Sequence, residues 1–433
     1  MSLYTSMTTA ISGLTAQSRA LGNVADNVAN SQTIGFKRTD TNFVQYVTRS
    51  TQRLNLPGSV MARPDYQNSV QGTLQQTDNP LAIAIAGQGF FSVAQQRGTQ
   101  DGLPVFDENP LYTRAGDFRM DRNGYLVNGQ GYFLQAWRMD PTGNPDRTQL
   151  SPMRVDQTVY NPVATSRIEM SANLPADNTL TPSVAQAQVF DALGRTHTLD
   201  LTWTNLGPNR WRLSVSAADD VNAAARGSVE MFFGDAATPP VADGTLGSFA
   251  NATGSLAGSA SVPNTPARIT FDADFGQGTQ PMTLEIGTFG ASDGITQFKG
   301  QQISVSGLSQ NGVPPGAFSG VALAENGDIS INYDNGQIRT VGRVPIASFR
   351  DPDRLQRVDG QAFQRTQESG GALIGDPATL GIGKLVTNTL EGSNVDIASE
   401  FSKLILAQRA YTANTKIVTA TDELLQDTLN MRR

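Results

Sequence analysis

The sequence predicts a multidomain α+β protein in which helices at the two chain ends enclose a mostly β middle. Two observations support this fold class. Apolar residues recur at every seventh position near each end of the chain, a spacing typical of amphipathic helices that pack side by side. Between the ends, short alternating runs are separated by turn residues, which is typical of β-strands. We expect the helices to form an antiparallel coiled-coil-like domain, with β-rich domains nested between them.

The C-terminal stretch carries the longer repeat. No Gly or Pro interrupts it, and Asn394 and Asp396 are good capping residues, which predicts a helix from Ile397 to Met431. At about 1.5 Å per residue such a helix would span roughly 50 Å, more than most closing helices need, so we expect it to have a partner. The apolar row consists of Ile397, Leu404, Tyr411, Val418 and Leu425, with Phe401 beside it.

The N-terminal repeat supplies that partner, a helix from Leu3 to Ala29. Gly13 and Gly22 each weaken it by roughly 1 kcal/mol relative to Ala, so packing must hold it in place. An ordinary intramolecular helical hairpin is the alternative to a helix pair that leaves surface for neighbouring chains. Its apolar row consists of Met7, Leu14, Leu21 and Val28, with Ile11 beside it.

The remaining chain divides by pattern. Residues 1–32 and 392–433 form the helical domain, and residues 33–71 are expected to be an extended connector. Residues 72–144 and 320–391 are predicted to form a β-rich inner domain, with residues 145–319 as a β-rich insert. The five Asn-Gly pairs indicate tight hairpin turns, because Asn and Gly both tolerate a left-handed backbone. These pairs begin at Asn123, Asn128, Asn311, Asn326 and Asn335.

Composition excludes several classes of function. Only 16% of residues are charged and the formal net charge is −7, which argues against nucleic-acid binding. No apolar run approaches the roughly 20 residues of a membrane span, so membrane insertion is not expected. Cysteine is absent and His197 is the only histidine, which removes the usual metal ligands and nucleophiles. We expect no cofactor, no metal site and no catalytic site, with His197 a structural residue in a strand.

Two patterns deserve comparison with known chemistry. Asp272 and Asp274 share one face of a predicted strand, as the carboxylates of a retaining glycosidase might, although aspartates on a β edge are usually solvated. Asp121 and Asn123 resemble a fragment of a calcium loop that lacks the downstream glutamate, so a hairpin turn is the better interpretation. Neither pattern makes a convincing catalytic constellation.

After the first helix, NVADNVANSQTIGFKRTDTNF resembles the signature of the bacterial flagellar rod and hook axial protein family. Four further blocks are similar to this family: QGTLQQTDNPLAIAIAGQGFFSV, YTRAGDFRMDRNGYLVNGQGYFLQ, VPIASFRDPDRLQRVDGQAFQRTQESG and the closing helix. The resemblance covers roughly residues 1–140 and 320–433. Ala82 departs from it, because the family often has an acidic residue there. The residues that carry the signature are Asn27, Asn30, Gly35, Phe36 and Lys37.

The resemblance implies a structural role without catalysis. Within the family, rod subunits are generally shorter, so a chain with this insert resembles a hook subunit, and a distal rod subunit is the alternative. A secreted carbohydrate-active β protein that uses Asp272 and Asp274 is the alternative from another class. The implied activity is helical polymerisation into a flexible hollow tube, a universal joint that transmits motor torque from rod to filament and carries the export channel. The apolar rows of both helices would supply the assembly contacts.

The resemblance also implies partners and a location. The partners would be further copies of the chain, a rod protein below, a hook-filament junction protein above, and a hook cap and the type III export machinery during assembly. The location would be the extracellular flagellar hook, reached without a cleaved signal peptide. The lack of cysteine suits this route, because disulfides would obstruct a chain that travels unfolded.

Overall fold

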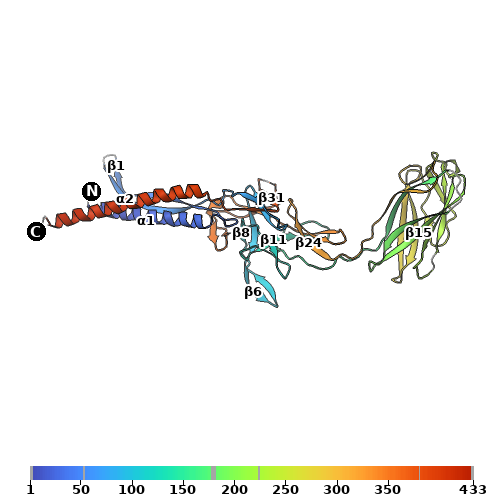
Figure 1. Cartoon of the computed structure of the whole chain (residues 1–433), viewed down its shortest axis with the longest axis horizontal. Helices are drawn as coiled ribbons and strands as arrows, with labels where there is room; N and C mark the ends of the chain where they lie inside the picture. Colours follow the sequence, from blue (N-terminus) through green and yellow to red (C-terminus); the bar gives the residue numbers. More distant parts are fainter. Residues whose placement is uncertain (1–2, 52–53, 177–181, 223–224, 380, 431–433) are drawn as a thin grey trace. The chain divides into compact units, whose positions relative to one another are not determined.

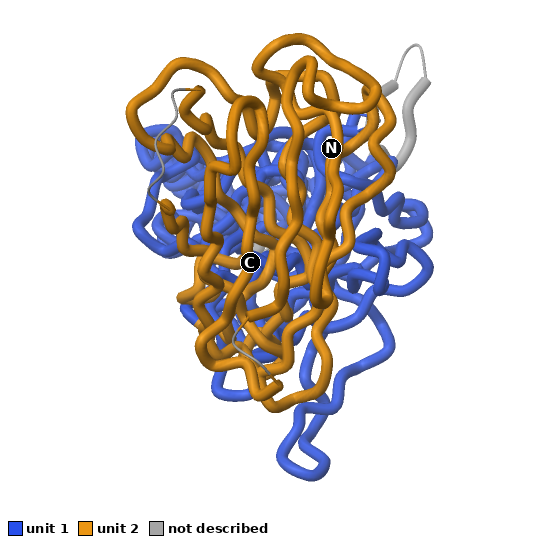
Figure 2. The backbone as a smooth tube through the Cα atoms, turned by 90° about the vertical axis from the view of Figure 1, so that its right-hand side faces the viewer, with its two compact units in different colours: residues 1–157, 319–332, 338–433 blue, residues 158–318, 333–337 orange. Residues whose placement is uncertain are grey.

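The computed structural model describes residues 3–51, 54–176, 182–222, 225–379 and 381–430. The chain forms two compact units, coloured separately in Figure 2. Unit 1 comprises residues 1–157, 319–332 and 338–433, and unit 2 comprises residues 158–318 and 333–337. Helices at both ends and several sheets between them confirm the predicted α+β class.

Two long helices, α1 (Leu3–Ala29) and α2 (Ile397–Asn430), lie side by side in unit 1 (Figure 1). They are antiparallel: Asn27 near the end of α1 contacts Glu400 near the start of α2, and Gly13 lies opposite Asn414. The predicted bounds of α1 are confirmed. The start of α2 is also as predicted, and Met431 lies outside the described residues.

The expected extended connector over 33–71 was wrong for most of its length. The strands β1 (Thr39–Thr51) and β2 (Leu54–Tyr66) pair as a two-stranded antiparallel sheet that contacts α1. Pro64 pairs with Thr41 in this ribbon. A two-stranded sheet has two free edges, where a residue without an N–H group is tolerated.

The β part of unit 1 joins segments from both halves of the chain. Strand β3 pairs with β32, β4 with β31, and β8 with β29. The largest sheet has 13 strands, and Phe90, Tyr112, Phe349 and Phe363 pack in one of its cores. A short 3-10 helix, Pro352–Arg354, precedes β28. Besides β1 and β2, the strands wholly or mostly in unit 1 are β3 (Leu74–Gln76), β4 (Ile83–Ala86), β5 (Phe90–Ala94), β6 (Gln96–Gln100), β7 (Leu103–Phe106), β8 (Leu111–Thr113), β9 (Arg119–Met120), β10 (Leu126–Val127), β11 (Phe133–Arg138), β12 (Ser151–Pro152), β24 (Phe318–Leu323), β25 (Asp328–Tyr333), β26 (Ile338–Arg343), β27 (Ile346–Ser348), β28 (Gln356–Val358), β29 (Ala362–Gln364), β30 (Leu373–Gly375), β31 (Lys384–Thr387) and β32 (Thr389–Glu391).

Unit 2 contains a five-stranded and a six-stranded sheet. Alternate residues of both sheets are buried in one core, which includes Trp203 and Trp211 of the first sheet and Phe271 and Leu284 of the second. A 3-10 turn, Gly234–Ala236, follows β17. The strands are β13 (Arg167–Pro175), β14 (Ser183–Phe190), β15 (Thr196–Gly207), β16 (Arg210–Ala217), β17 (Ala225–Phe233), β18 (Leu246–Ala250), β19 (Ala257–Gly258), β20 (Pro266–Asp274), β21 (Thr279–Thr288), β22 (Ile295–Phe298) and β23 (Ser304–Gln310).

The insert was expected to begin near residue 145, whereas unit 2 begins at Thr158. The intervening chain is bound to unit 1. Strand β12 pairs with β11, and the amide of Val155 donates to the Gly124 carbonyl at 2.8 Å. Composition alone did not reveal these backbone bonds.

Candidate assembly site

Small side chains line the seam between α1 and α2. On α1 the buried positions include Gly13, and an added Cβ there would lie 3.0 Å from the side-chain nitrogen Nδ2 of Asn414. Small residues allow the two helix backbones to approach closely, at the cost of little apolar burial for each residue. The buried residues of the two helices are Ala10, Gly13, Ala16, Ala20, Val24 and Asn27 of α1 and Glu400, Ala407 and Thr421 of α2.

The large apolar residues predicted as assembly contacts lie beside this seam. On α1, Met7, Leu14, Leu21 and Val28 are half-buried, as are Leu404, Val418 and Leu425 on α2. The other four are exposed: Ile11 at 44%, Ile397 at 45%, Phe401 at 52% and Tyr411 at 42%. The pair thus holds itself together through small residues and leaves much of its apolar surface uncovered. Further exposed apolar residues of the pair are Tyr4, Ile405, Leu406, Ile417 and Leu424.

The β1–β2 hairpin covers a different part of α1. The Thr9 hydroxyl donates to the Gly58 carbonyl at 2.9 Å, and the Val60 amide donates to Ser12 Oγ at 3.2 Å. Near the other end of α1, Asn23 Nδ2 donates to Thr41 Oγ1 at 2.8 Å. Side-chain bonds along the whole helix therefore fix the hairpin on it.

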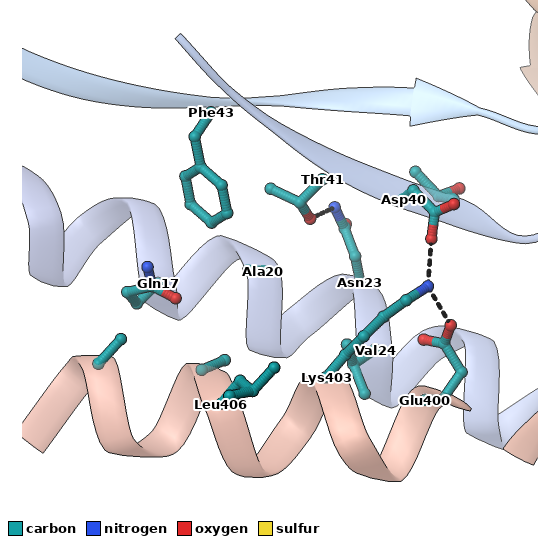
Figure 3. A pocket seen from close by; sticks show the side chains of 13 residues that line it. Gln17, Ala20, Asn23, Val24, Asp40, Thr41, Phe43, Glu400, Lys403 and Leu406 are labelled. Atoms are coloured by element: carbon teal, nitrogen blue, oxygen red, sulfur yellow. Dashed lines mark hydrogen bonds and ion pairs between the residues drawn. The ribbon is translucent and has the colours of Figure 1, made fainter. Parts of the chain in front are cut away.

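A groove of about 570 Å³ lies between α1, α2 and β1 (Figure 3). Its walls are mainly apolar, and Phe43 and Leu406 are exposed on it. At one end Lys403 Nζ donates to Asp40 Oδ1 at 2.5 Å and to Glu400 Oε1 at 2.6 Å. Burial lowers the pKa of Lys403, but these two carboxylates outweigh it and raise that pKa overall. The polar end is therefore a satisfied ion cluster.

A second ion cluster, which we name the junction cluster, consists of Lys37, Arg114 and Glu391. Lys37 Nζ lies 2.6 Å from Glu391 Oε1, Arg114 Nη1 lies 2.9 Å from Glu391 Oε2, and the three side chains are at most 1% exposed. The Gly72 amide also donates to Glu391 Oε1, at 2.9 Å. Burial lowers the pKa of Lys37 to about 8 and lowers that of Arg114, and the attraction of Glu391 opposes both shifts only in part.

The junction cluster therefore joins three distant segments in the interior of unit 1. Lys37 follows α1, Arg114 follows β8, and Glu391 ends β32 shortly before α2. Removal of Glu391 would leave two buried cations without their shared partner, which costs about 3–5 kcal/mol in typical cases. Among the signature residues, only Lys37 belongs to this cluster. Sequence reasoning missed Arg114 and Glu391, because isolated charges far apart in the chain give no pattern.

Two further signature residues, Asn27 and Asn30, organise the end of α1. Buried Asn27 exchanges two hydrogen bonds with the backbone of Thr39, and its Nδ2 also donates to Glu400 Oε2 at 3.0 Å. Asn30 donates to the Asp26 carbonyl at 3.0 Å and accepts from Thr33 Oγ1 at 3.2 Å. Asn27 thus connects α1, β1 and α2.

Gly35 and Phe36 occupy the tight passage after α1. Gly35 has φ +71°, and an added Cβ would lie 2.6 Å from the Ala115 nitrogen. Its amide donates to the Glu391 carbonyl at 2.8 Å. Phe36 is buried, with the guanidinium of Arg357 5.8 Å from its ring centre. Both residues therefore serve close packing against the β part of unit 1.

The residues before α2 differ in role. Asp396 caps the helix, because its Oδ1 accepts from the Ser399 amide at 3.1 Å. Asn394, expected as a second cap, instead binds the loop after α1: its Oδ1 accepts from the Arg38 amide at 2.7 Å, and its Nδ2 donates to the carbonyls of Gln67 and Val70. Like the junction cluster, Asn394 fixes where α2 begins relative to α1.

The described residues show no convincing catalytic arrangement. His197 is in β15 as predicted, with its ring stacked on Phe275 and its nitrogens beside Asp191 and Asp219. Asp274 accepts from the amides of Gly276 and Gly278, so its carboxylate serves a turn. No group of three or more His, Cys, Asp or Glu in the described ranges could hold a metal ion. Neither described helix is long and apolar enough to cross a membrane.

Four sequence profiles of protein families match the chain in order. They are described as "Flagella basal body rod protein" over residues 7–37, "Flagellar hook protein FlgE/F/G D1 domain" over 84–173, "Flagellar basal body protein FlaE D2 domain" over 155–313 and "Flagellar basal body rod FlgEFG protein C-terminal" over 386–431. The first and last matches include most of the two helices.

Several similar proteins are flagellar hook proteins. The flagellar hook protein FlgE of Brucella abortus is 32% identical over 440 residues, with 100% of each chain covered, and that of Rhizobium meliloti is 30% identical over 448 residues, again with full coverage. The hook protein of Escherichia coli is 29% identical, over 98% of this chain and 99% of that one. A crystal structure of Helicobacter pylori FlgE2 covers 73% of this chain with a TM-score of 0.48 and 14% identity.

These matches do not favour the rod or carbohydrate-active alternatives, because hook proteins of nearly the same length align from end to end. The chain therefore belongs to the flagellar hook protein FlgE family and is a structural subunit of the bacterial flagellar hook.

Proposed function

We propose that the chain polymerises helically into a flexible hollow tube, with the α1–α2 pairs of neighbouring subunits forming its inner wall around an export channel. This tube acts as a universal joint that passes motor torque from the rod to the filament. This role is structural and needs no catalysis.

The uncovered apolar face of α2 carries this proposal. Ile397, Phe401 and Ile405 are spaced four residues apart and are 45%, 52% and 49% exposed, so they form one stripe on the helix surface. A monomer would leave this stripe in water, whereas a neighbouring subunit would bury it at a gain of roughly 25 cal/mol for each Å² of apolar surface. The half-buried residues Leu14 and Leu404 extend the interface at the rim of the seam.

Unit 2 is proposed to lie outside this wall. The solvent face of its strands is largely polar: Gln186 of β14, Thr198 of β15 and Thr270 of β20 alternate with core residues. Bending requires outer parts to slide past neighbours as each row of subunits lengthens and shortens. Polar side chains that can replace a contact with water by a contact with a neighbour suit such sliding. Apolar side chains buried in a dry interface would hinder it.

The proposed role also implies which proteins adjoin the subunit and where it assembles. We propose a rod protein at the lower end, a hook-filament junction protein at the upper end, and a hook cap with the type III export machinery during growth. The subunit would travel outward without a cleaved signal peptide and assemble at the extracellular hook. The absence of cysteine supports passage as an unfolded chain.

The test is polymerisation of purified Phe401→Asp, which places a charge in the exposed stripe, compared with Ser402→Asp as the matched control at an exposed polar position of α2 on a different face. We expect Phe401→Asp to remain monomeric in sedimentation while Ser402→Asp and wild type form tubes. Both variants should keep the wild-type melting temperature, because neither side chain is buried in the monomer. Tubes formed by Phe401→Asp at the wild-type rate would refute the proposal.

A further inference from the structure

Three of the five Asn-Gly pairs lie in turns of one kind, at residues 121–124, 324–327 and 333–336. In each turn the Gly amide donates to the carbonyl three residues earlier, at 3.1, 2.9 and 3.1 Å for Gly124, Gly327 and Gly336. Only the Gly of each pair has a positive φ, which corrects our expectation that Asn would also be left-handed. These three turns can therefore be compared residue by residue.

In two of the turns the Asn side chain is held. Asn326 Oδ1 accepts from the Asp328 amide at 3.0 Å, and its Nδ2 donates to Asp328 Oδ2 at 2.7 Å. Asn335 Oδ1 accepts from the Gln337 amide at 3.0 Å, and its Nδ2 donates to the Pro314 carbonyl at 2.8 Å. In both cases the Asn carboxamide accepts the amide two residues later, an interaction that closes the turn.

The turn at 121–124 differs because its first residue is an aspartate. Asp121 Oδ1 accepts from the amides of Asn123 at 2.9 Å and of Tyr125 at 2.7 Å. Tyr125 is the residue two after Asn123, so Asp121 has taken the bond that the Asn makes in the other two turns. The Asn123 carboxamide is exposed and forms no hydrogen bond with any described residue.

The remaining two pairs are also held. Asn128 is fully buried, and its Oδ1 accepts from the amides of Gln130 and Tyr132. Asn311 Oδ1 accepts from the amides of Ser166 and Arg167, and its Nδ2 donates to Ser166 Oγ. Asn123 is thus the only one of the five whose carboxamide can rotate without breaking a hydrogen bond within the described structure.

We propose that Asn123 is a site of spontaneous deamidation in the folded subunit. The backbone nitrogen of Gly124 attacks Cγ of Asn123, forming an N–Cγ bond while the Cγ–Nδ2 bond breaks. The amide proton of Gly124 passes to solvent, and ammonia leaves with a proton from solvent, which yields a five-membered succinimide. Water then opens this ring at either carbonyl, giving aspartate or isoaspartate. The net reaction consumes one water and releases one ammonia.

The product changes a turn that holds two segments together. The Val155 amide donates to the Gly124 carbonyl at 2.8 Å, and Arg154 Nε donates to the Asn123 carbonyl at 2.9 Å. An isoaspartate at 123 adds one methylene to the main chain and displaces both carbonyls, whereas an aspartate only adds a charge beside Asp121. This reaction is independent of the proposed assembly.

The test begins with the purified full chain incubated in mildly alkaline buffer, followed by proteolysis and mass measurement of the peptides. We expect Asn123 to convert roughly tenfold faster than Asn326 or Asn335, a difference that two side-chain hydrogen bonds can produce. In urea, where the turns are lost, the five sites should convert at similar rates. Faster conversion of any of the other four sites in the folded chain would overturn the proposal.

A reciprocal pair of variants tests the cause. Asp121→Ala frees the Tyr125 amide for Asn123 and should slow conversion at 123 severalfold. Ala324→Asp, at an exposed position, supplies a carboxylate for the Asp328 amide and should speed conversion at Asn326 severalfold. Circular dichroism checks that each variant is folded. If Asp121→Ala did not fold, Ala324→Asp would decide alone, and an unchanged rate at Asn326 would refute the mechanism.

Discussion

Lys37 Nζ lies 2.6 Å from Glu391 Oε1 with both side chains fully buried, and yet the pKa of Lys37 is lowered, to about 8. Loss of hydration therefore outweighs the attraction of Glu391 and the hydrogen bond to it. The protonated amine is less favourable in the folded chain than in the unfolded chain. This buried ion pair fixes the position of three segments rather than adding net stability.

The first prediction concerns pH. Lys37 has a pKa of about 8 when folded and an ordinary value of 10.5 when unfolded, so between these values the unfolded chain holds a proton that the folded chain has lost. The contribution of Lys37 to the free energy of unfolding therefore rises with pH in this window. Urea titrations measure the free energy of unfolding of wild type and of Lys37→Met. The wild-type value minus the variant value should increase from pH 8 to pH 10.5. A decreasing difference would contradict this.

The comparison with Lys37→Met is needed because other groups titrate nearby. Burial raises the pKa values of Tyr112 and Tyr132, so their contribution to stability falls as pH rises past the ordinary tyrosine value of 10.0. Both proteins contain these tyrosines, and their effect cancels in the difference. The difference in the free energy of unfolding between the two proteins therefore reflects the junction cluster alone.

The second prediction compares the members of the junction cluster. Glu391→Gln leaves two buried cations without their carboxylate and should lower the free energy of unfolding by about 3–5 kcal/mol. Lys37→Met leaves Glu391 bound to Arg114 and to the Gly72 amide, so it should stay within about 1 kcal/mol of wild type near pH 7. Chemical unfolding at neutral pH measures both. Equal losses for the two variants would mean that Glu391 is not the shared partner.

The third prediction uses two glycines of the N-terminal segment. Gly35→Ala forces a left-handed alanine against the Ala115 nitrogen and should cost about 1–3 kcal/mol. Gly22→Ala is the control: it lies inside α1 with no atom within 4 Å of an added Cβ, and should stabilise the helix by roughly 1 kcal/mol. Thermal unfolding should move in opposite directions for the two variants. A shift in the same direction would refute the assigned roles.

The heptad rows predicted the two helices well and their seam poorly. Neither row is interrupted by proline, and the predicted start of α2 follows from Asp396, which is a local signal. The seam itself uses Ala16, Ala20 and Ala407, residues that contribute little to a pattern counted from large apolar side chains. Helix formation depends on local spacing, whereas the choice between two adjacent faces depends on how closely the backbones approach.

The junction and the hairpin lay beyond sequence reasoning for another reason. Arg114 and Glu391 are 277 residues apart, and only the pairing of N-terminal with C-terminal strands brings them together. Asn27 and Lys37 were identified by resemblance, without the contacts that explain them. The β1–β2 ribbon was expected to be a connector, because local patterns do not show that α1 lies against it.

The last prediction concerns the isolated subunit. We expect its ends to be the first parts digested by trypsin, because much of the apolar surface of the helix pair is uncovered before assembly. The ion pairs of Lys403 with Asp40 and Glu400 should delay cleavage there, so cleavage after Arg409 and Lys416 should come first. Asp40→Asn removes one partner and should speed cleavage after Lys403 severalfold, with little change at Lys416. Mass measurement of timed digests would identify the cleavage sites. A monomer whose first 30 and last 40 residues resist digestion would disprove the expectation.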